Sequence, residues 1–76
     1  MAPPTDLTPL ERTLLAALAA DGERSPGALA LETGADLPAV LDAVARLRER
    51  GLLARAGFDA CRLTDRGRAA VEGETA

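Results

Sequence analysis

Arginine is the residue type with the clearest chemical potential in this chain, and its distribution is uneven. All nine basic residues are arginines, and seven of them lie within residues 46–68, a segment with a net charge of +4. Residues 1–45 carry a net charge of −5. The planar guanidinium group donates several hydrogen bonds in a geometry that matches phosphate oxygens. The use of arginine instead of lysine is explained first by a GC-rich genome, and the alternative is that these arginines bind phosphate.

Most other chemistry is excluded by the residue types that are missing. The chain has no histidine and a single cysteine, Cys61. An internal disulfide, a zinc site and a Cys/His catalytic pair are therefore all ruled out. We find no nucleophile–base pair and no phosphate-binding loop, so we expect neither an enzyme nor a bound cofactor or metal.

The location of the protein is also constrained by the sequence. No apolar run approaches the roughly 20 residues that a membrane span needs. The first six residues, MAPPTD, have no basic start followed by an apolar stretch, so they do not form a signal peptide. We expect a cytoplasmic protein that makes no membrane contact.

The first two predicted helices each begin with a capping residue followed by proline. The sequence TPLE at residues 8–11 combines a capping threonine, a proline suited to the first turn and a glutamate that can complete a capping box. This helix is expected to end near Ala20. Ser25 and Pro26 repeat the signal and predict a short helix through Thr33, closed by Gly34. Residues 1–7 are rich in proline and are expected to form an extended arm.

The third predicted helix begins after Asp36 as the capping residue and ends at Gly51. Its core stripe follows helical spacing and consists of Val40, Val44 and Leu47. The next segments, residues 52–55 and 60–63, predict two short strands joined by a turn at residues 56–59. A last helix, capped by Thr64, is expected over residues 65–71 and frays at residues 73–76. An extended pair near Glu23 and Arg24 would supply a third small strand.

This order of elements predicts an α+β, mostly helical fold, the winged helix-turn-helix, with a three-helix core, a hairpin wing and a short C-terminal helix. We expect one domain over residues 8–72. Three stretches resemble the MarR-type and PadR-type families of bacterial transcription regulators: LALETGADLPAV at residues 29–40, LRERGLL at residues 47–53 and CRLTDRGR at residues 61–68. Each occupies the position that those families give it.

The resemblance implies that the third helix enters the major groove of duplex DNA and that the wing contacts the DNA backbone or minor groove. The implied groove-facing residues of the helix are Leu37, Ala39, Leu41, Asp42, Ala45 and Arg46. The implied phosphate contacts are Arg50, Arg55 and Arg62. The first half of the helix offers no Ser, Thr, Asn, Gln, Arg or Lys to read bases, and Asp42 could accept only from a cytosine amine.

The arginines allow specific expectations about pairing. In the third helix we expect Arg46 to face the groove while Arg48 pairs with nearby acidic groups, although the whole run could also be a solvated face. In the hairpin we expect Arg55 and Arg62 to face each other. Paired like charges are unfavourable on a hairpin, so this arrangement points to a bound phosphate.

Several apolar residues permit two interpretations. Leu37 and Leu41 either complete the core, or pack beneath the N-terminal arm, or form an exposed strip that docks a protein partner. We expect Phe58 to fold back on Leu63 instead of inserting into a partner or a groove. Cys61 is expected to fill the core and not to act as a redox switch.

Two functions follow from these patterns. The first is a transcription regulator that binds duplex DNA through the third helix and the wing, with a homodimer possible through the first helix, the arm or the last helix. The alternative is a winged-helix adaptor that binds a protein partner on the third helix without strong DNA binding.

Overall fold

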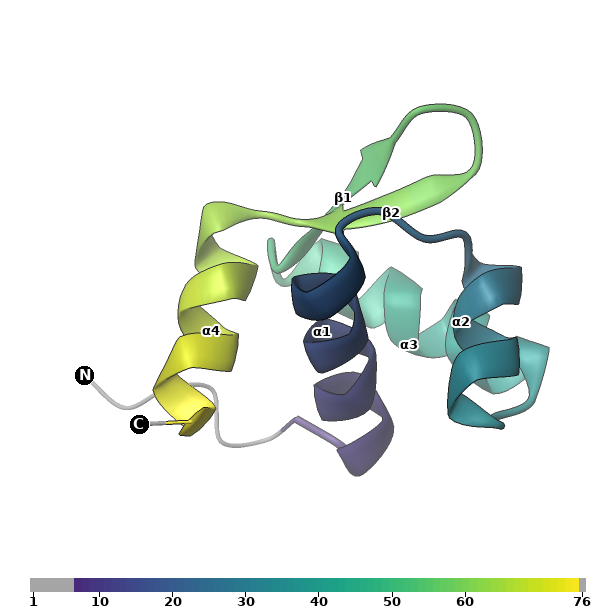
Figure 1. The fold of residues 1–76 in the computed structure, drawn as a ribbon, viewed down its shortest axis with the longest axis horizontal. Helices are drawn as coiled ribbons and strands as arrows, with labels where there is room; N and C mark the ends of the chain where they lie inside the picture. Colours follow the sequence, from purple (N-terminus) through teal and green to yellow (C-terminus); the bar gives the residue numbers. More distant parts are fainter. Residues whose placement is uncertain (1–6, 76) are drawn as a thin grey trace.

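The computed structural model describes residues 7–75, which form four helices and a two-stranded antiparallel hairpin (Figure 1). In chain order the elements are α1 (Pro9–Asp21), α2 (Pro26–Thr33), α3 (Leu37–Glu49), β1 (Leu53–Ala56), β2 (Ala60–Leu63) and α4 (Asp65–Thr75). This order is that of a winged helix-turn-helix and confirms the predicted fold class.

The helix starts follow the capping signals of the sequence. At α1, the Thr8 backbone N–H donates to Glu11 Oε1 at 2.8 Å and the Glu11 N–H donates to Thr8 Oγ1 at 3.1 Å, which completes the capping box. At α2, the Ala28 N–H donates to Ser25 Oγ at 3.1 Å. Asp36 stands at the start of α3 as predicted, but its side chain makes no capping hydrogen bond. The two capped helices thus have their first N–H groups satisfied by side chains.

The turn between α2 and α3 depends on glycine. Gly34 has φ of 75° and ψ of 10°, a left-handed conformation that side chains with a Cβ rarely adopt. Its backbone N–H donates to the Ala30 carbonyl at 2.9 Å, which satisfies one of the last carbonyls of α2. The chain therefore reverses within three residues and places α3 against α2.

The junction between α3 and the hairpin differs slightly from the prediction. Strand β1 begins at Leu53, one residue later than expected, because Leu52 bonds elsewhere. The Leu52 N–H donates to the Leu47 carbonyl at 2.9 Å, and its own carbonyl accepts from the Thr64 N–H at 3.1 Å. Leu52 therefore links the end of α3 to the start of α4.

The third small strand expected near Glu23 and Arg24 is present as an isolated bridge. The Arg24 N–H donates to the Cys61 carbonyl at 3.1 Å, and the Cys61 N–H donates to the Arg24 carbonyl at 2.7 Å. Strand β2 thus has backbone partners on both sides. The connection between α1 and α2 is held to the wing by these two bonds.

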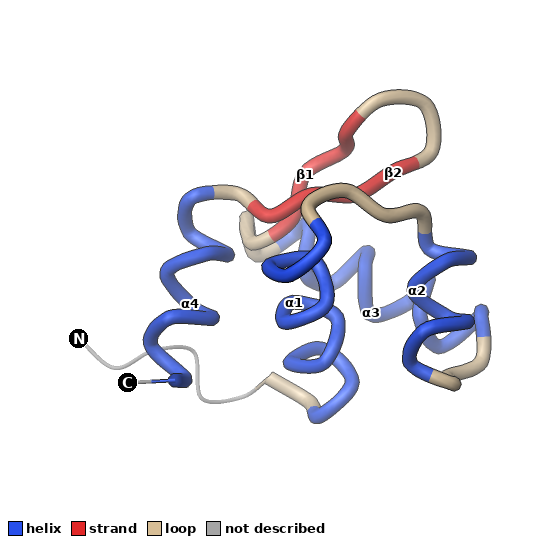
Figure 2. The backbone as a smooth tube through the Cα atoms, viewed as in Figure 1, coloured by secondary structure: helices blue, strands red, loops and turns tan. Residues whose placement is uncertain are grey.

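The core lies between the helices and beneath the base of the hairpin. Helix α1 packs against α2, α3, α4 and β2, and the hairpin projects beyond the helices (Figures 1 and 2). The buried cluster is aliphatic and consists of Leu7, Leu14, Leu15, Leu18, Leu29, Val40, Ala43, Val44, Leu47, Leu52, Leu53, Cys61, Leu63 and Ala70. The stripe predicted for the third helix, residues 40, 44 and 47, is buried as expected.

The two ends of the domain differ in how they compare with the predictions. The last helix runs from Asp65 to Thr75 and so extends beyond the predicted end at Val71. The predicted domain bounds, with a frayed end over residues 73–76, stay predictions. The predicted arm lies outside the described residues except for Leu7, which is buried. None of the helices within residues 7–75 has the length and apolar character that a membrane crossing requires.

Candidate nucleic-acid interface

Helix α3 exposes two flanks, one on each side of its buried stripe. At about 100° per residue, the exposed positions divide into a flank beside α1 and a flank beside the hairpin. The α1 flank carries Ala39, Arg46 and Arg50, and the wing flank carries Leu37, Leu41, Ala45 and Arg48. The residues predicted from the sequence therefore do not share one surface.

The α1 flank is dominated by an ion-pair network around Arg46. Arg46 Nε donates to Glu11 Oε2 at 3.2 Å, and Arg46 Nη1 donates to Asp42 Oδ2 at 3.3 Å. The Glu11 side chain is only 3% exposed, so it holds the guanidinium against α1. The sequence predicts that Arg48 pairs with acidic groups while Arg46 faces the groove; the structure instead pairs Arg46 with Glu11 and Asp42.

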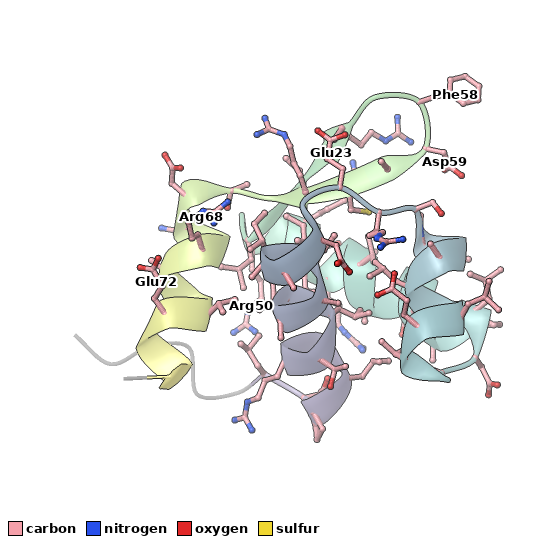
Figure 3. The ribbon with its side chains drawn as sticks, viewed as in Figure 1. Glu23, Arg50, Phe58, Asp59, Arg68 and Glu72 are labelled. Carbon is pink, nitrogen blue, oxygen red and sulfur yellow. The ribbon has the colours of Figure 1, made fainter. Side chains whose placement is uncertain are left out.

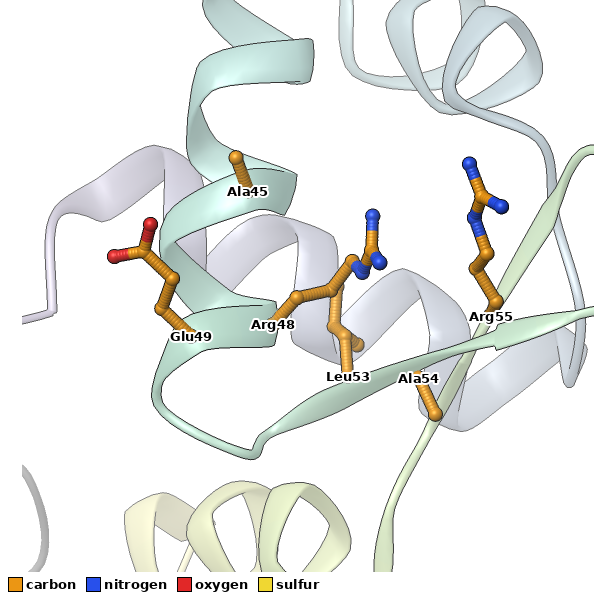
Figure 4. A pocket seen from close by; sticks show the side chains of 6 residues that line it. All are labelled: Ala45, Arg48, Glu49, Leu53, Ala54 and Arg55. Atoms are coloured by element: carbon orange, nitrogen blue, oxygen red, sulfur yellow. The ribbon is translucent and has the colours of Figure 1, made fainter.

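The wing flank brings together two arginines from different elements. Arg48 of α3 and Arg55 of β1 line an open hollow of ≈ 520 Å³ together with Ala45, Glu49, Leu53 and Ala54. The two guanidinium groups extend in the same direction, whereas Glu49 points away from them (Figure 4). Within the described part of the chain, neither arginine has a carboxylate within ion-pair distance. These cations are therefore available to an external anion.

A second hollow continues this surface toward the tip of the wing. It has a volume of ≈ 180 Å³ and shares Ala45, Arg48 and Arg55 with the first hollow. Its further lining includes Pro26 from the start of α2, Leu41 from α3 and Phe58 from the hairpin turn. We call the combined surface of Leu41, Ala45, Arg48 and Arg55 the wing groove. It joins the third helix to the hairpin without a break.

The hairpin register separates the two wing arginines. Arg55 pairs with Cys61, and Ala54 pairs with Arg62. Directly opposed residues share a face and neighbouring residues alternate, so Arg55 and Arg62 project from opposite faces of the hairpin. The expectation that they face each other is wrong. Arg55 lies on the wing-groove side with Cys61, and Arg62 is exposed on the other side.

Three apolar side chains, which could have completed the core or folded back on the hairpin, are exposed in the structure. Leu37 and Leu41 are 45% and 49% exposed, so they do not complete the core. Phe58 is fully exposed and points away from the hairpin turn (Figure 3). It does not fold back on Leu63, because Leu63 pairs with Leu53 at the opposite end of the hairpin. These residues contribute apolar area to the wing flank and the wing tip.

Cys61 is buried beneath the wing groove, which confirms its predicted place in the core. Its burial raises the pKa of the thiol above the ordinary value of 9.0 because the thiolate would lose its hydration. The positive charges of Arg48 and Arg55 oppose this effect in part, and the negative charge of Asp59 adds to it. The thiol is therefore neutral at physiological pH and lies close to both groove arginines.

The raised pKa of Cys61 predicts a loss of stability in alkaline solution. The folded state holds the thiol proton more tightly than the unfolded chain, so this contribution is complete below pH 9.0 and disappears as the pH rises through the raised pKa. The chain has no lysine and no tyrosine, so few other side chains titrate in this range. Urea unfolding of the wild type should give a decreasing free energy above pH 9.0. The Cys61→Ala variant should lack this decrease, and an equal decrease in both would contradict the assignment.

Residues 5–60, which include α1, α2, α3 and most of the hairpin, match the model of the MarR family. The chain belongs to the MarR family. Members of this family are transcription regulators and not enzymes, and the present chain carries their winged-helix DNA-binding domain. The MarR-type resemblance predicted from residues 29–68 is thereby confirmed.

Solved structures of MarR-family and related regulators share the fold. BpsR of Bordetella bronchiseptica, whose DNA binding is regulated by 6-hydroxynicotinic acid, is 32% identical with a TM-score of 0.88 over 96% of this chain. The reduced form of MarR from E. coli is 26% identical with a TM-score of 0.85 over 91%. A probable transcriptional regulator of Pseudomonas aeruginosa is 29% identical with a TM-score of 0.87 over 95%. None of the curated proteins compared with this sequence matches it.

The MarR-family domain described here spans only part of those regulators. It covers 56% of BpsR, 52% of E. coli MarR and 59% of the Pseudomonas protein.

The sequence did not lead us to predict that Arg48 and Arg55 lie together in the wing groove. The signal was present, because Arg48 lies seven residues after Leu41 and therefore on the same flank of α3.

Proposed function

We propose that this MarR-family domain binds duplex DNA with α3 in the major groove and that Arg48 and Arg55 contact phosphates on either side of the wing groove. The observation that supports the proposal most strongly is that these two guanidinium groups, neither of them in an ion pair, line one hollow between α3 and β1 and extend in the same direction. Phosphate contacts supply most of the affinity of such complexes and fix the register of the protein on the duplex.

The arginines predicted from the sequence to contact DNA are not equally placed to do so. Arg55 keeps its predicted phosphate contact and gains Arg48 as its partner. Arg46 is held by Glu11 and Asp42, so its free energy of DNA binding would have to exceed the loss of these pairs. Arg62 lies on the opposite face of the hairpin. We therefore do not assign Arg62 a phosphate contact in this proposal. Roles in DNA binding for Ala39, Asp42, Arg46 and Arg50 stay predictions.

The salt dependence of duplex binding tests the proposal. Each phosphate contact releases condensed counterions, so the logarithm of the affinity falls with the logarithm of the salt concentration. Arg48→Ala and Arg55→Ala should each reduce that slope by about 1 and weaken binding similarly for all sequences. The measurement is fluorescence anisotropy with a labelled random-sequence duplex at several salt concentrations.

Arg62→Ala is the matched control because it removes the same charge from the opposite face of the same hairpin. Its slope should stay close to that of the wild type. If Arg62→Ala reduced the slope as strongly as Arg55→Ala, DNA would also contact the face of the hairpin that carries Arg62. That result would contradict the proposal. Absence of duplex binding at low salt would favour the adaptor function instead, with the exposed Leu37 and Leu41 as its docking residues.

We also propose that the functional unit is a homodimer, as is typical of MarR-family regulators. Two copies would place two α3 helices in successive major grooves, and each copy would add its own pair of groove arginines. Sedimentation of the protein with and without a duplex measures this assembly directly.

A further inference from the structure

The exposed wing flank of α3 is apolar along its first part, before Arg48. Leu37, Leu41 and Ala45 follow one another at intervals of four residues and form a row on the wing flank, at 45% and 49% exposure for the two leucines. We call these three residues the apolar row. The row leads directly to Arg48 and Arg55, since Leu41 and Ala45 line the same hollow as the two arginines.

Hydrogen bonding cannot be the means by which this row distinguishes bases. The exposed side chains between residues 37 and 45 are Leu37, Pro38, Ala39, Leu41, Asp42 and Ala45. Asp42 is the single polar group of this set, and it is already paired with Arg46 at 3.3 Å. A leucine or alanine side chain can discriminate only by contact with another apolar group. On the major-groove edges of the four bases, that group is the C5-methyl of thymine.

We infer that the apolar row recognises thymine methyl groups in the major groove, with the groove arginines setting the depth and register of α3. The inference rests on the proposed binding of duplex DNA and specifies the chemistry that the helix reads. The apolar row is continuous with the wing groove, so the positive charges of Arg48 and Arg55 lie at one end of it. This arrangement favours a nucleic acid over an apolar protein surface as the partner that binds the row. Leu37 and Leu41 are then specificity-determining residues, and Arg48 and Arg55 are positioning residues.

Removal of the methyl groups alone is the most direct test. Tight-binding duplexes are selected from a random-sequence pool made with thymidine, and the selected duplexes are then remade with deoxyuridine, which pairs identically but lacks the methyl. Each methyl that the row contacts should contribute roughly fourfold in affinity, as expected for one buried CH₂-sized group. The salt slope should not change, because no phosphate contact is lost.

A matched pair of variants separates direct contact from an effect of the methyl group on DNA shape. Leu41→Ala should reduce the ratio of thymidine to deoxyuridine affinity toward one, since the side chain that contacts the methyl is shortened. Leu31→Ala, at the most exposed leucine of the chain and outside both hollows, should leave the ratio at the wild-type value. Circular dichroism establishes that both variants are folded, which is expected because both side chains are exposed.

The outcomes are distinct. Equal affinity for the two duplexes, or an unchanged ratio in Leu41→Ala, would overturn methyl recognition while leaving DNA binding intact if the Arg48 and Arg55 slopes behave as expected. A protein that binds no duplex at low salt would overturn both the proposed function and this inference. A reduced ratio in Leu31→Ala would show that the apolar contact lies on α2 and would also overturn it.

Discussion

The Gly67→Ala variant is expected to lose about 3 kcal/mol of unfolding free energy, a large part of the stability of so small a domain. A Cβ at this position would overlap the Leu52 carbonyl oxygen and would lie 3.2 Å from Leu63 Cδ2. The carbonyl cannot move freely because it accepts the Thr64 N–H at 3.1 Å. The helical preference of alanine over glycine, about 1 kcal/mol, offsets only part of this strain. Urea unfolding followed by far-UV circular dichroism measures the effect.

Gly27→Ala is the matched control, because Gly27 also lies in the first turn of a helix. Its Cβ would meet only Ser25 Oγ, at 3.9 Å, which is ordinary contact. The substitution should leave stability unchanged or raise it by up to about 1 kcal/mol. A Gly67→Ala protein as stable as the Gly27→Ala protein would show that α4 does not approach the Leu52 backbone so closely.

The second large effect is expected at Glu11. Glu11→Ala should lower the unfolding free energy by about 2 kcal/mol, because it removes an acceptor of the capping box and the buried carboxylate that pairs with the half-exposed Arg46. The Thr8 N–H would lose its partner at 2.8 Å and Arg46 Nε its partner at 3.2 Å. Glu11→Gln should lose less, because its side-chain oxygen can still accept from the Thr8 N–H. The measurement is again the urea midpoint at neutral pH.

Glu49→Ala provides the control for a glutamate in the same region. Glu49 lines the same hollow as Glu11 and Arg46 but is exposed, and its replacement should change stability by no more than about 0.5 kcal/mol. A double-mutant cycle that combines Glu11→Ala with Arg46→Ala then measures the coupling energy between Glu11 and Arg46. A coupling energy near zero would mean that the cost of Glu11→Ala comes from the cap alone.

Local signals in the sequence predicted the elements well. The capping box of Thr8 and Glu11, the cap at Ser25 and the turn at Gly34 depend on residues close in the chain, and all three are present. The extended pair near Glu23 and Arg24 was also predicted from the order of the elements, and the structure adds Cys61 as the partner of Arg24. The fold class could therefore be predicted from the order and ends of its elements.

The site was harder to predict because it depends on side-chain direction. The expected strands, residues 52–55 and 60–63, would place Arg55 and Arg62 on one face. The observed pairing of Leu53 with Leu63 shifts the register by one residue, and a shift of one moves every side chain of a strand to the other face. The preference of Arg46 for Glu11 was equally hidden, because the two residues are 35 positions apart and meet only when α1 packs on α3.

The bonds between Arg24 and Cys61 give the short connection from α1 to α2 a mechanical role. Because β2 is anchored to this connection by the two bonds, the wing cannot swing away from the helices without breaking them. These bonds therefore hold the hairpin in a fixed position relative to α3. Insertion of residues between positions 22 and 25 would weaken these two bonds and let the hairpin move relative to α3, even with every arginine in place.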